Sequence, residues 1–161
     1  MKQKEVHFVY EVYNSVKSLN KSDAALLERA RTITATAYAP YSNFQVSAVA
    51  LLENGEMMHG SNQENASYPV GLCAERVLIS AISSLHPNVP IHTMAISYHN
   101  LNGDSSHPIS PCGICRQSLL EYESRLNHPI RLIMSGMEGK VFVIPNAAML
   151  LPLSFTSEDL K

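Results

Sequence analysis

The sequence has no long apolar run, no cluster of basic residues and no repeated or low-complexity segment. Because no stretch approaches the roughly 20 apolar residues that span a bilayer, we expect no membrane-spanning helix. The formal net charge is −2, and the 12 lysines and arginines are spread along 161 residues, which is not typical of a protein that coats nucleic acid. The first residues are charged but lack an apolar h-region, so no secretory signal is expected.

The length and composition indicate about one globular domain. A chain of 161 residues with 45% hydrophobic residues can bury a proper core. Apolar runs of strand length alternate with segments of helical periodicity. The expected strands lie at residues 44–52, 56–60, 94–98, 130–135 and 141–144. This alternation predicts an α/β fold in which helices cover the faces of a five-stranded mixed sheet.

Residues 1–21 are expected to be an N-terminal extension, and residues 22–161 a single catalytic domain. A first helix is predicted to begin near Ser22, where Ser22 and Asp23 supply polar caps. Within the extension, residues 7–13 are β-prone. This pattern favours either an additional edge strand or an arm that packs on a neighbouring subunit.

Cysteine is scarce, and all three cysteines fall in two short strings. The strings are Cys73-Ala74-Glu75-Arg76 and Pro111-Cys112-Gly113-Ile114-Cys115-Arg116-Gln117. A Cys-x-Glu followed by a Pro-Cys-x-x-Cys is typical of a catalytic zinc site. Three ligands leave the fourth tetrahedral position for water, and a carboxylate that is not a ligand stands beside it.

Both strings are predicted to lie at helix N-termini. Cys112 and Cys115 are three residues apart, so one helical turn places them on the same face. The N–H groups and the dipole of a helix N-terminus favour thiolate over thiol. Three thiolates around Zn²⁺ leave an excess negative charge, which Arg76, or else Arg116, is placed to offset by donating to sulfur.

Other interpretations of the cysteines remain open on the residues alone. A Cys-x-x-Cys is also typical of redox pairs, but residues 107–111 do not have the pattern of a preceding strand. A structural zinc site needs a fourth ligand, and His107 is the nearest histidine to the pair. The cysteines could also be small buried hydrophobes.

With these motifs, the chain resembles a known family, the small three-cysteine cytidine deaminases. Zinc deaminases carry the pattern H-x-E followed by P-C-x-x-C, and Cys73 stands here in the place of the histidine. Further matching strings are Tyr38-Ala39-Pro40-Tyr41-Ser42-Asn43-Phe44, Asn62-Gln63-Glu64-Asn65-Ala66, Tyr68-Pro69 and Leu150-Leu151-Pro152-Leu153-Ser154-Phe155. The resemblance spans most of the chain from Ala24 to Leu160 and implies a three-layer α/β/α architecture.

The resemblance implies a role for each motif. One Zn²⁺ per subunit is held by Cys73, Cys112 and Cys115, and Glu75 moves protons between water, ring N3 and the departing ammonia. As an alternative, Glu75 could be only a first-turn acid favoured by the helix dipole.

Substrate recognition also follows from the resemblance. Asn62 and Glu64 match the family's ribose-binding pair, and Ala74 matches a substrate contact. Phe44 matches an aromatic that stacks on the base, although phenylalanines at strand starts are often core residues. Phe155 matches an aromatic supplied by a neighbouring subunit, and Tyr68 a subunit contact. These matches imply a homotetramer with shared active sites. Ser47 departs from the glycine that is common in relatives.

We therefore expect a zinc-dependent hydrolase that deaminates cytidine and 2′-deoxycytidine in pyrimidine salvage. The expected partner is a small nucleoside, with no nucleic-acid polymer and no membrane. Reduced cysteines committed to a metal favour a cytoplasmic location. The rival hypotheses are a deaminase of another base or nucleoside, a polymer-editing deaminase, and a non-catalytic zinc-stabilised binding module.

Overall fold

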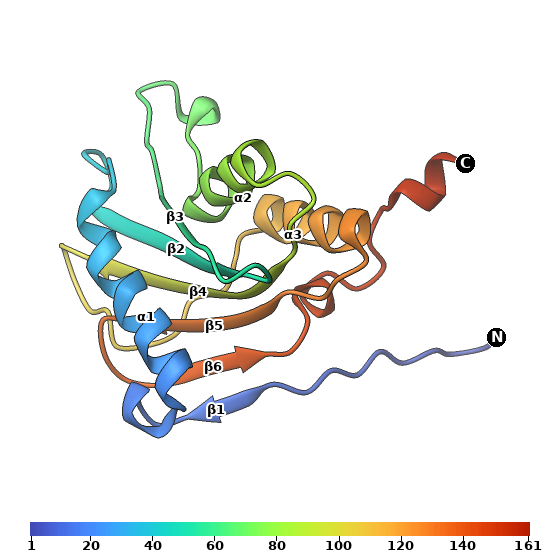
Figure 1. The fold of residues 1–161 in the computed structure, drawn as a ribbon, viewed down its shortest axis with the longest axis horizontal. Coiled ribbons are helices and arrows are strands. Elements are labelled where there is room, and N and C mark those ends of the chain that lie inside the picture. Colours follow the sequence, from blue (N-terminus) through green and yellow to red (C-terminus); the bar gives the residue numbers. More distant parts are fainter.

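The computed structural model describes residues 1–161 and shows a mixed sheet with helices on both faces (Figure 1). The helices are α1 (Lys21–Ile33), α2 (Ala74–Leu85) and α3 (Gly113–Leu126). The strands are β1 (Glu11–Tyr13), β2 (Phe44–Leu52), β3 (Met57–Ser61), β4 (Ile91–Asn100), β5 (Arg131–Gly136) and β6 (Val141–Ile144). None of the helices combines the length and the apolar composition needed to cross a membrane.

The sheet has six strands, in the order β1-β6-β5-β4-β2-β3. Only β4 and β5 pair in parallel, so the sheet is mixed, as predicted. The predicted number of five strands is wrong. Three residues of the N-terminal extension pair antiparallel with the edge of β6, where Val12 lies opposite Phe142. An edge strand was one of the two interpretations of this segment.

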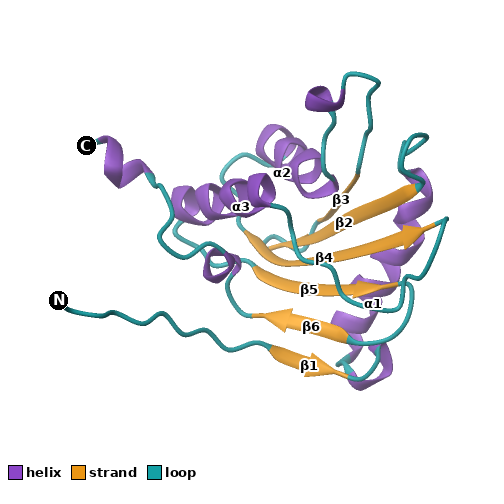
Figure 2. Cartoon of the chain, turned by 180° about the vertical axis from the view of Figure 1, so that it is seen from behind, coloured by secondary structure: helices purple, strands orange, loops and turns teal.

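Two hydrophobic cores lie on opposite faces of the sheet, because successive strand residues point to opposite sides. In β2, Val49 packs with the buried face of α1. Its neighbours Ala48 and Ala50 pack with α2 and α3 on the other face. The view from behind shows α1 alone on one side and α2 beside α3 on the other (Figure 2). The molecule therefore has three layers.

The helices α2 and α3 each begin directly after a cysteine. Cys73 is the N-cap residue of α2, and Cys112 is the N-cap residue of α3. Both residues have extended backbone, and neither caps its helix with its own side chain. The prediction that both cysteine strings lie at helix N-termini is confirmed.

Strand β3 contacts the backbone of α2 at Gly60. A Cβ atom on Gly60 would lie 2.7 Å from the amide nitrogen of Leu78 and 2.8 Å from the carbonyl oxygen of Ala74. These distances are too short for any side chain, and the atoms that it would meet are backbone atoms, which cannot move aside. Only glycine therefore allows the strand and the helix to lie so close together.

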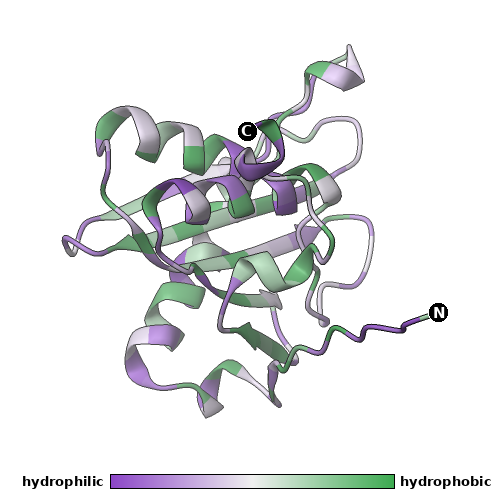
Figure 3. Ribbon diagram, turned by 90° about the vertical axis from the view of Figure 1, so that its right-hand side faces the viewer, coloured by the Kyte–Doolittle hydropathy of each residue, from purple (hydrophilic) through white to green (hydrophobic).

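The chain before β1 extends away from the sheet, and its first residues are mostly hydrophilic (Figure 3). Residues 1–10 belong to no helix or strand and are exposed. The C-terminal segment leaves the body of the molecule after a short helical turn, Ala147–Leu150. The two ends of the chain are thus the parts least covered by the rest of the fold.

Candidate active site

A cavity of about 610 Å³ opens beside the N-terminus of α2. Its lining comes from β2 and the segment before it, the segment after β3, the start of α2 and the loop before α3. The lining residues are Tyr41, Ser42, Val46, Asn62, Gln63, Glu64, Asn65, Tyr68, Gly71, Leu72, Cys73, Ala74, Glu75, Ile109, Ser110 and Cys112. They include two carboxylates but no lysine, arginine or histidine.

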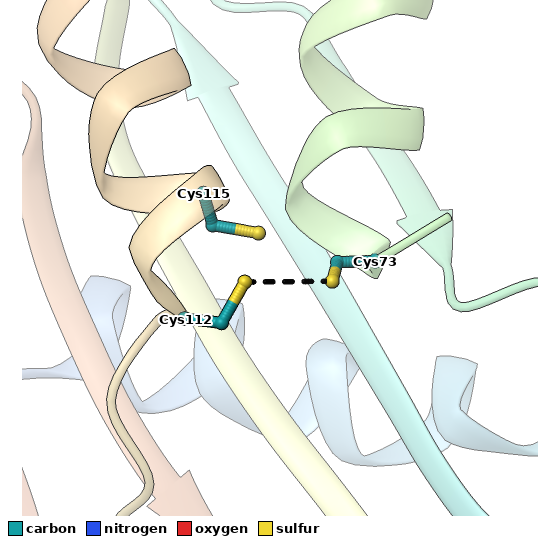
Figure 4. Close-up of side chains that lie close together, drawn as sticks. All are labelled: Cys73, Cys112 and Cys115. Atoms are coloured by element: carbon teal, nitrogen blue, oxygen red, sulfur yellow. Dashed lines mark hydrogen bonds between the residues drawn. The ribbon is translucent and has the colours of Figure 1, made fainter. Parts of the chain in front are cut away.

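The three cysteine side chains point toward one another (Figure 4), and Cys73 and Cys112 line the cavity. The Sγ atoms of Cys73 and Cys112 are 3.7 Å apart, and all three Sγ atoms lie within 4.8 Å of one another. Zinc–sulfur bonds of about 2.3 Å in a tetrahedron place two sulfurs about 3.8 Å apart. The three side chains therefore fit a single zinc ion.

The fourth ligand of a closed structural site is missing from this cluster. It is the only group of three or more His, Cys, Asp or Glu side chains positioned to hold a metal, and it contains no histidine. His107, the candidate fourth ligand, shares a 3.2 Å hydrogen bond with the hydroxyl of Tyr98. The donor set thus matches a three-ligand site with one open position.

The electrostatics of the cluster favour one thiolate even without a metal. A hydrogen bond from Cys115 is the largest cause that lowers the pKa of Cys73, to about 6. The positive charge of Arg76 acts in the same direction. The hydrogen bond to Cys73 and burial raise the pKa of Cys115. Negative charge is therefore concentrated on the sulfur that begins α2, where the helix dipole also favours it.

Glu75 lies in the first turn of α2, lines the cavity and is only 4% exposed. Burial is the main cause that raises the pKa of its carboxyl, and a hydrogen bond involving Cys115 partly opposes this shift. A carboxyl whose pKa is raised by burial accepts a proton more readily than an exposed one, as a general acid and base requires. Glu75 thus has the position and environment of a general acid and base.

The two arginines of the cysteine strings have different surroundings. The guanidinium of Arg116 donates from Nε to the carbonyl of Pro111 at 2.8 Å, and from Nη1 to the carbonyl of Leu150 at 3.0 Å. These bonds join the loop before Cys112 to the C-terminal segment. Arg76 instead acts on the pKa of Cys73 through its charge. Of the two, Arg76 is the one whose charge bears on a sulfur.

Glu64 is held in place at the rim of the cavity. Its carboxylate accepts hydrogen bonds from the hydroxyl and amide of Ser42 and from the amide of Tyr41. The Ser42 hydroxyl is the largest cause that lowers the pKa of Glu64. Glu64 therefore stays ionised and oriented without any ligand.

Asn62 also lines the cavity, but part of its amide is used by the backbone of β2. Its Oδ1 accepts from the amide of Val46 at 2.7 Å, and its Nδ2 donates to the carbonyl of Phe44 at 2.9 Å. A carboxamide has two N–H donors and two acceptor lone pairs. One N–H and one lone pair thus remain for a ligand, in an orientation that β2 fixes.

Two residues that the resemblance assigned to substrate contact are not among the lining residues. Phe44 stacks on Tyr98, with ring centroids 4.9 Å apart and planes inclined by 14°. Phe155 is 59% exposed, and its carbonyl accepts a hydrogen bond from Gln117. Ala74, by contrast, is buried in the lining beside Glu75. Within one chain, the structure brings together the cysteines, Glu75, Ala74, Asn62 and Glu64.

Three residues of the site, Ser42, Ile109 and Ser110, had no predicted role. Ser42 belongs to a string quoted for the resemblance, but its bond to Glu64 crosses 22 residues of sequence. Ile109 and Ser110 line the cavity from the loop that ends at Pro111. Their position directly before the Cys-x-x-Cys is the one signal that could have indicated them.

The comparisons with known proteins agree with this geometry. The family model "Cytidine and deoxycytidylate deaminase zinc-binding region" matches residues 20–127. A cytidine deaminase of Halalkalibacterium halodurans is 36% identical over 126 residues, which cover 78% of this chain and 87% of the relative. A cytidine deaminase of Sporosarcina psychrophila is 32% identical over 84% of this chain and 93% of the relative.

Solved structures show the same similarity. The crystal structure of cytidine deaminase from Burkholderia pseudomallei has a TM-score of 0.71 and 34% identity, and the match covers 85% of this chain and all of that one. The cytidine deaminase structure from Mycobacterium tuberculosis has a TM-score of 0.62 and 30% identity over 81% of this chain and 94% of that one.

Proposed function

We propose that this chain, which belongs to the family of cytidine and deoxycytidylate deaminases, hydrolyses cytidine and 2′-deoxycytidine to the corresponding uridines and ammonia. The observation that carries the proposal is the buried carboxyl of Glu75 beside three converging cysteine sulfurs, two of which belong to residues that line the same cavity. A redox pair or a closed structural site does not need such a carboxyl.

Glu75 is the group that moves protons. A zinc ion bound by Cys73, Cys112 and Cys115 would supply a Lewis acid that makes water nucleophilic near neutral pH. The carboxylate of Glu75 accepts a proton from the attacking water and delivers it to N3 of the ring. It then accepts the proton of the new C4 hydroxyl and passes it to the departing amino group, so that ammonia leaves and the C4 carbonyl forms. Its raised pKa suits both steps.

The rim of the cavity favours a free nucleoside. Glu64 and the remaining hydrogen-bonding capacity of Asn62 can bind sugar hydroxyls, and both side chains are already oriented. A 5′-phosphate would find no basic side chain among the lining residues and would be repelled by the Glu64 carboxylate. The same lack of basic residues disfavours a nucleic-acid polymer.

We further propose that the active enzyme is a homotetramer in which neighbouring subunits complete the site. Phe155 is exposed and does not line the cavity of its own chain, which agrees with a role in a neighbouring one. Phe44 stacks on Tyr98 and is not among the lining residues, and we retain it as a proposed base contact. Tyr68 is exposed at the cavity rim and remains the proposed subunit contact there.

The proposed biological role is pyrimidine salvage with one zinc per subunit. The three free thiols that the metal requires fit the reducing cytoplasm, which is the location that we propose.

A substrate panel tests the proposal. The purified, zinc-loaded protein is incubated with cytidine, 2′-deoxycytidine, CMP, adenosine, guanine and a single-stranded oligonucleotide, and ammonia release is measured. We expect activity on the first two compounds only. If neither of them is deaminated while zinc is bound, the proposal is wrong. Activity on adenosine or guanine alone would favour a deaminase of another base, and activity on the oligonucleotide a polymer-editing enzyme.

A further inference from the structure

The N-terminal arm, residues 1–10, has no partner strand within the chain. It precedes β1 and lies outside the family match, which begins at residue 20. The pairing of β1 with β6 reaches only Glu11 opposite Val143, and β6 ends at Ile144. Pro145 follows, and because proline has no N–H it cannot extend the ladder. The arm therefore continues the direction of β1 with its backbone groups free.

The arm carries an apolar stripe on one face. In an extended chain, alternate residues share a face, so Val6, Phe8 and Tyr10 lie in line with Val12 of β1. The rings of Phe8 and Tyr10 are 6.1 Å apart, and Tyr10 contacts Phe142 of β6 edge-on at 5.1 Å. The four stripe residues are between 43% and 65% exposed. An apolar, unpaired strand of this kind is a template for another strand.

We propose that residues 5–13 pair antiparallel with the same residues of a second copy of this chain, about a two-fold axis at Val9. Two identical antiparallel strands related by a two-fold axis form a self-complementary contact, which a different partner would not provide. The free edge of β1 takes part in this pairing, so the two six-stranded sheets join into one across the axis. The contact goes beyond the proposed activity and does not depend on it.

The arrangement of residues in the arm selects Val9 as the centre. In an antiparallel pair, directly opposed residues point to the same face of the sheet, so both have odd or both have even numbers. A two-fold axis perpendicular to the sheet therefore lies where one residue faces its own copy. With the axis at Val9, apolar residues face apolar residues and a histidine faces a glutamate. The opposed pairs are Phe8 with Tyr10, Val6 with Val12, His7 with Glu11 and, at the two ends, Glu5 with Tyr13. Aromatic, aliphatic and His–Glu pairs of this kind stabilise antiparallel strands.

Neighbouring registers are less complementary. With the axis at Tyr10, Val9 faces Glu11 and His7 faces Tyr13, so the His–Glu pair is lost. With the axis at Phe8, Glu5 faces Glu11, and like charges directly opposite each other destabilise a sheet. With the axis at His7, Lys4 faces Tyr10 and interrupts the apolar stripe. The side-chain pattern therefore specifies both the partner, a second copy, and the register.

Disulfide cross-linking tests this contact in the full-length, zinc-loaded protein. In the Val9→Cys variant the new cysteine faces its own copy across the axis, at a separation that a disulfide can span. We expect a disulfide-linked dimer on mild oxidation, formed about tenfold faster or more than between unpaired exposed cysteines, because pairing supplies a high effective concentration. Non-reducing denaturing electrophoresis measures the rate.

Val6→Cys and Val12→Cys are the matched controls, since both positions are exposed and neither faces itself in this register. Each single variant should cross-link slowly, whereas the double variant should cross-link as fast as Val9→Cys. Equal rates for Val9→Cys and Val6→Cys would overturn the proposal, as would slow cross-linking of the double variant. Because cross-linking is independent of turnover, a failure of this contact is distinguishable from a failure of the proposed activity.

Discussion

The floor and the rim of the cavity differ in burial and in the elements that supply their side chains. The floor consists of Glu75 and the cysteines, which are positioned by the first turns of α2 and α3 against the sheet; Glu75 and Cys115 are buried, whereas Cys112 is exposed. The rim consists of Glu64 and Ser42, which belong to the segments that follow β3 and precede β2 and hold each other by hydrogen bonds at the surface. Buried, preorganised groups suit the chemical step, whereas exposed groups suit binding. The following variants separate these two contributions.

Removing a metal ligand should have the largest effect. Cys112→Ala removes one of the three sulfurs, so we expect the zinc content of the purified protein to fall well below one per chain. Turnover should fall by about a thousandfold or more, because the metal supplies several kcal/mol of transition-state stabilisation. Metal analysis and ammonia release measure the two effects. Ser118→Ala, on the same helix but outside the cavity lining, is the control, and full activity of Cys112→Ala would contradict the site.

Glu75→Gln should separate proton transfer from metal binding. The amide keeps the shape of the carboxyl but cannot accept the proton of water, so kcat should fall about 10²- to 10⁴-fold. The zinc content should be unchanged, because Glu75 is not among the sulfur ligands. Steady-state kinetics with cytidine, together with metal analysis, check both outcomes. A variant that keeps most of its turnover would remove Glu75 from the mechanism.

Replacing Arg116 should lower the stability of the fold, whereas replacing Arg76 should weaken zinc retention. Arg116→Met breaks the bonds to the carbonyls of Pro111 and Leu150, so the free energy of unfolding should fall by about 1–3 kcal/mol. Arg76→Met removes a charge that lowers the pKa of Cys73. Because protons then compete better with zinc, the metal should be lost at a higher pH than in the unmodified protein.

Denaturant titration and zinc retention across a pH series measure these two losses. The assignment of the two arginines is wrong if both variants show the same changes, or if Arg116→Met shifts the pH of zinc loss and Arg76→Met does not.

The smallest effect is expected at the rim. Ser42→Ala removes the hydroxyl that donates to Glu64, so the pKa of Glu64 should rise toward its ordinary value. The KM for cytidine should rise about two- to tenfold, as expected for one lost hydrogen bond, with little change in kcat. The rise should grow as the pH falls, since protonated Glu64 accepts hydrogen bonds less well. A loss in kcat instead of KM would place Ser42 in the chemical step.

Local signals in the sequence predicted the floor well. The spacing of Cys112 and Cys115 and the apolar periodicity after each string depend only on the geometry of one helix. The five longer strands were likewise predicted from local apolar runs in the sequence. The sixth strand, β1, has only three residues, and its pairing with β6 depends on a contact between residues about 130 positions apart in sequence, so no local pattern could decide it.

Long-range contacts could not be predicted in the same way. The string that contains Arg116 suggested a sulfur as its partner, but the carbonyl of Leu150 lies 34 residues away and is brought near only by the folded C-terminal segment. The placement of Phe44 on Tyr98 likewise depends on the pairing of β2 with β4. Side-chain partners across strands follow from register, which a single sequence specifies weakly.

The contact at Gly60 has a consequence for selectivity. The strand that leads to Asn62 touches the helix backbone at Ala74, immediately before Glu75. The spacing between the segment that carries Asn62 and the helical turn that carries Glu75 is therefore fixed by two backbones in contact. If Asn62 binds the sugar and Glu75 moves the protons, as proposed, a substrate must match the distance that this contact sets between the two segments.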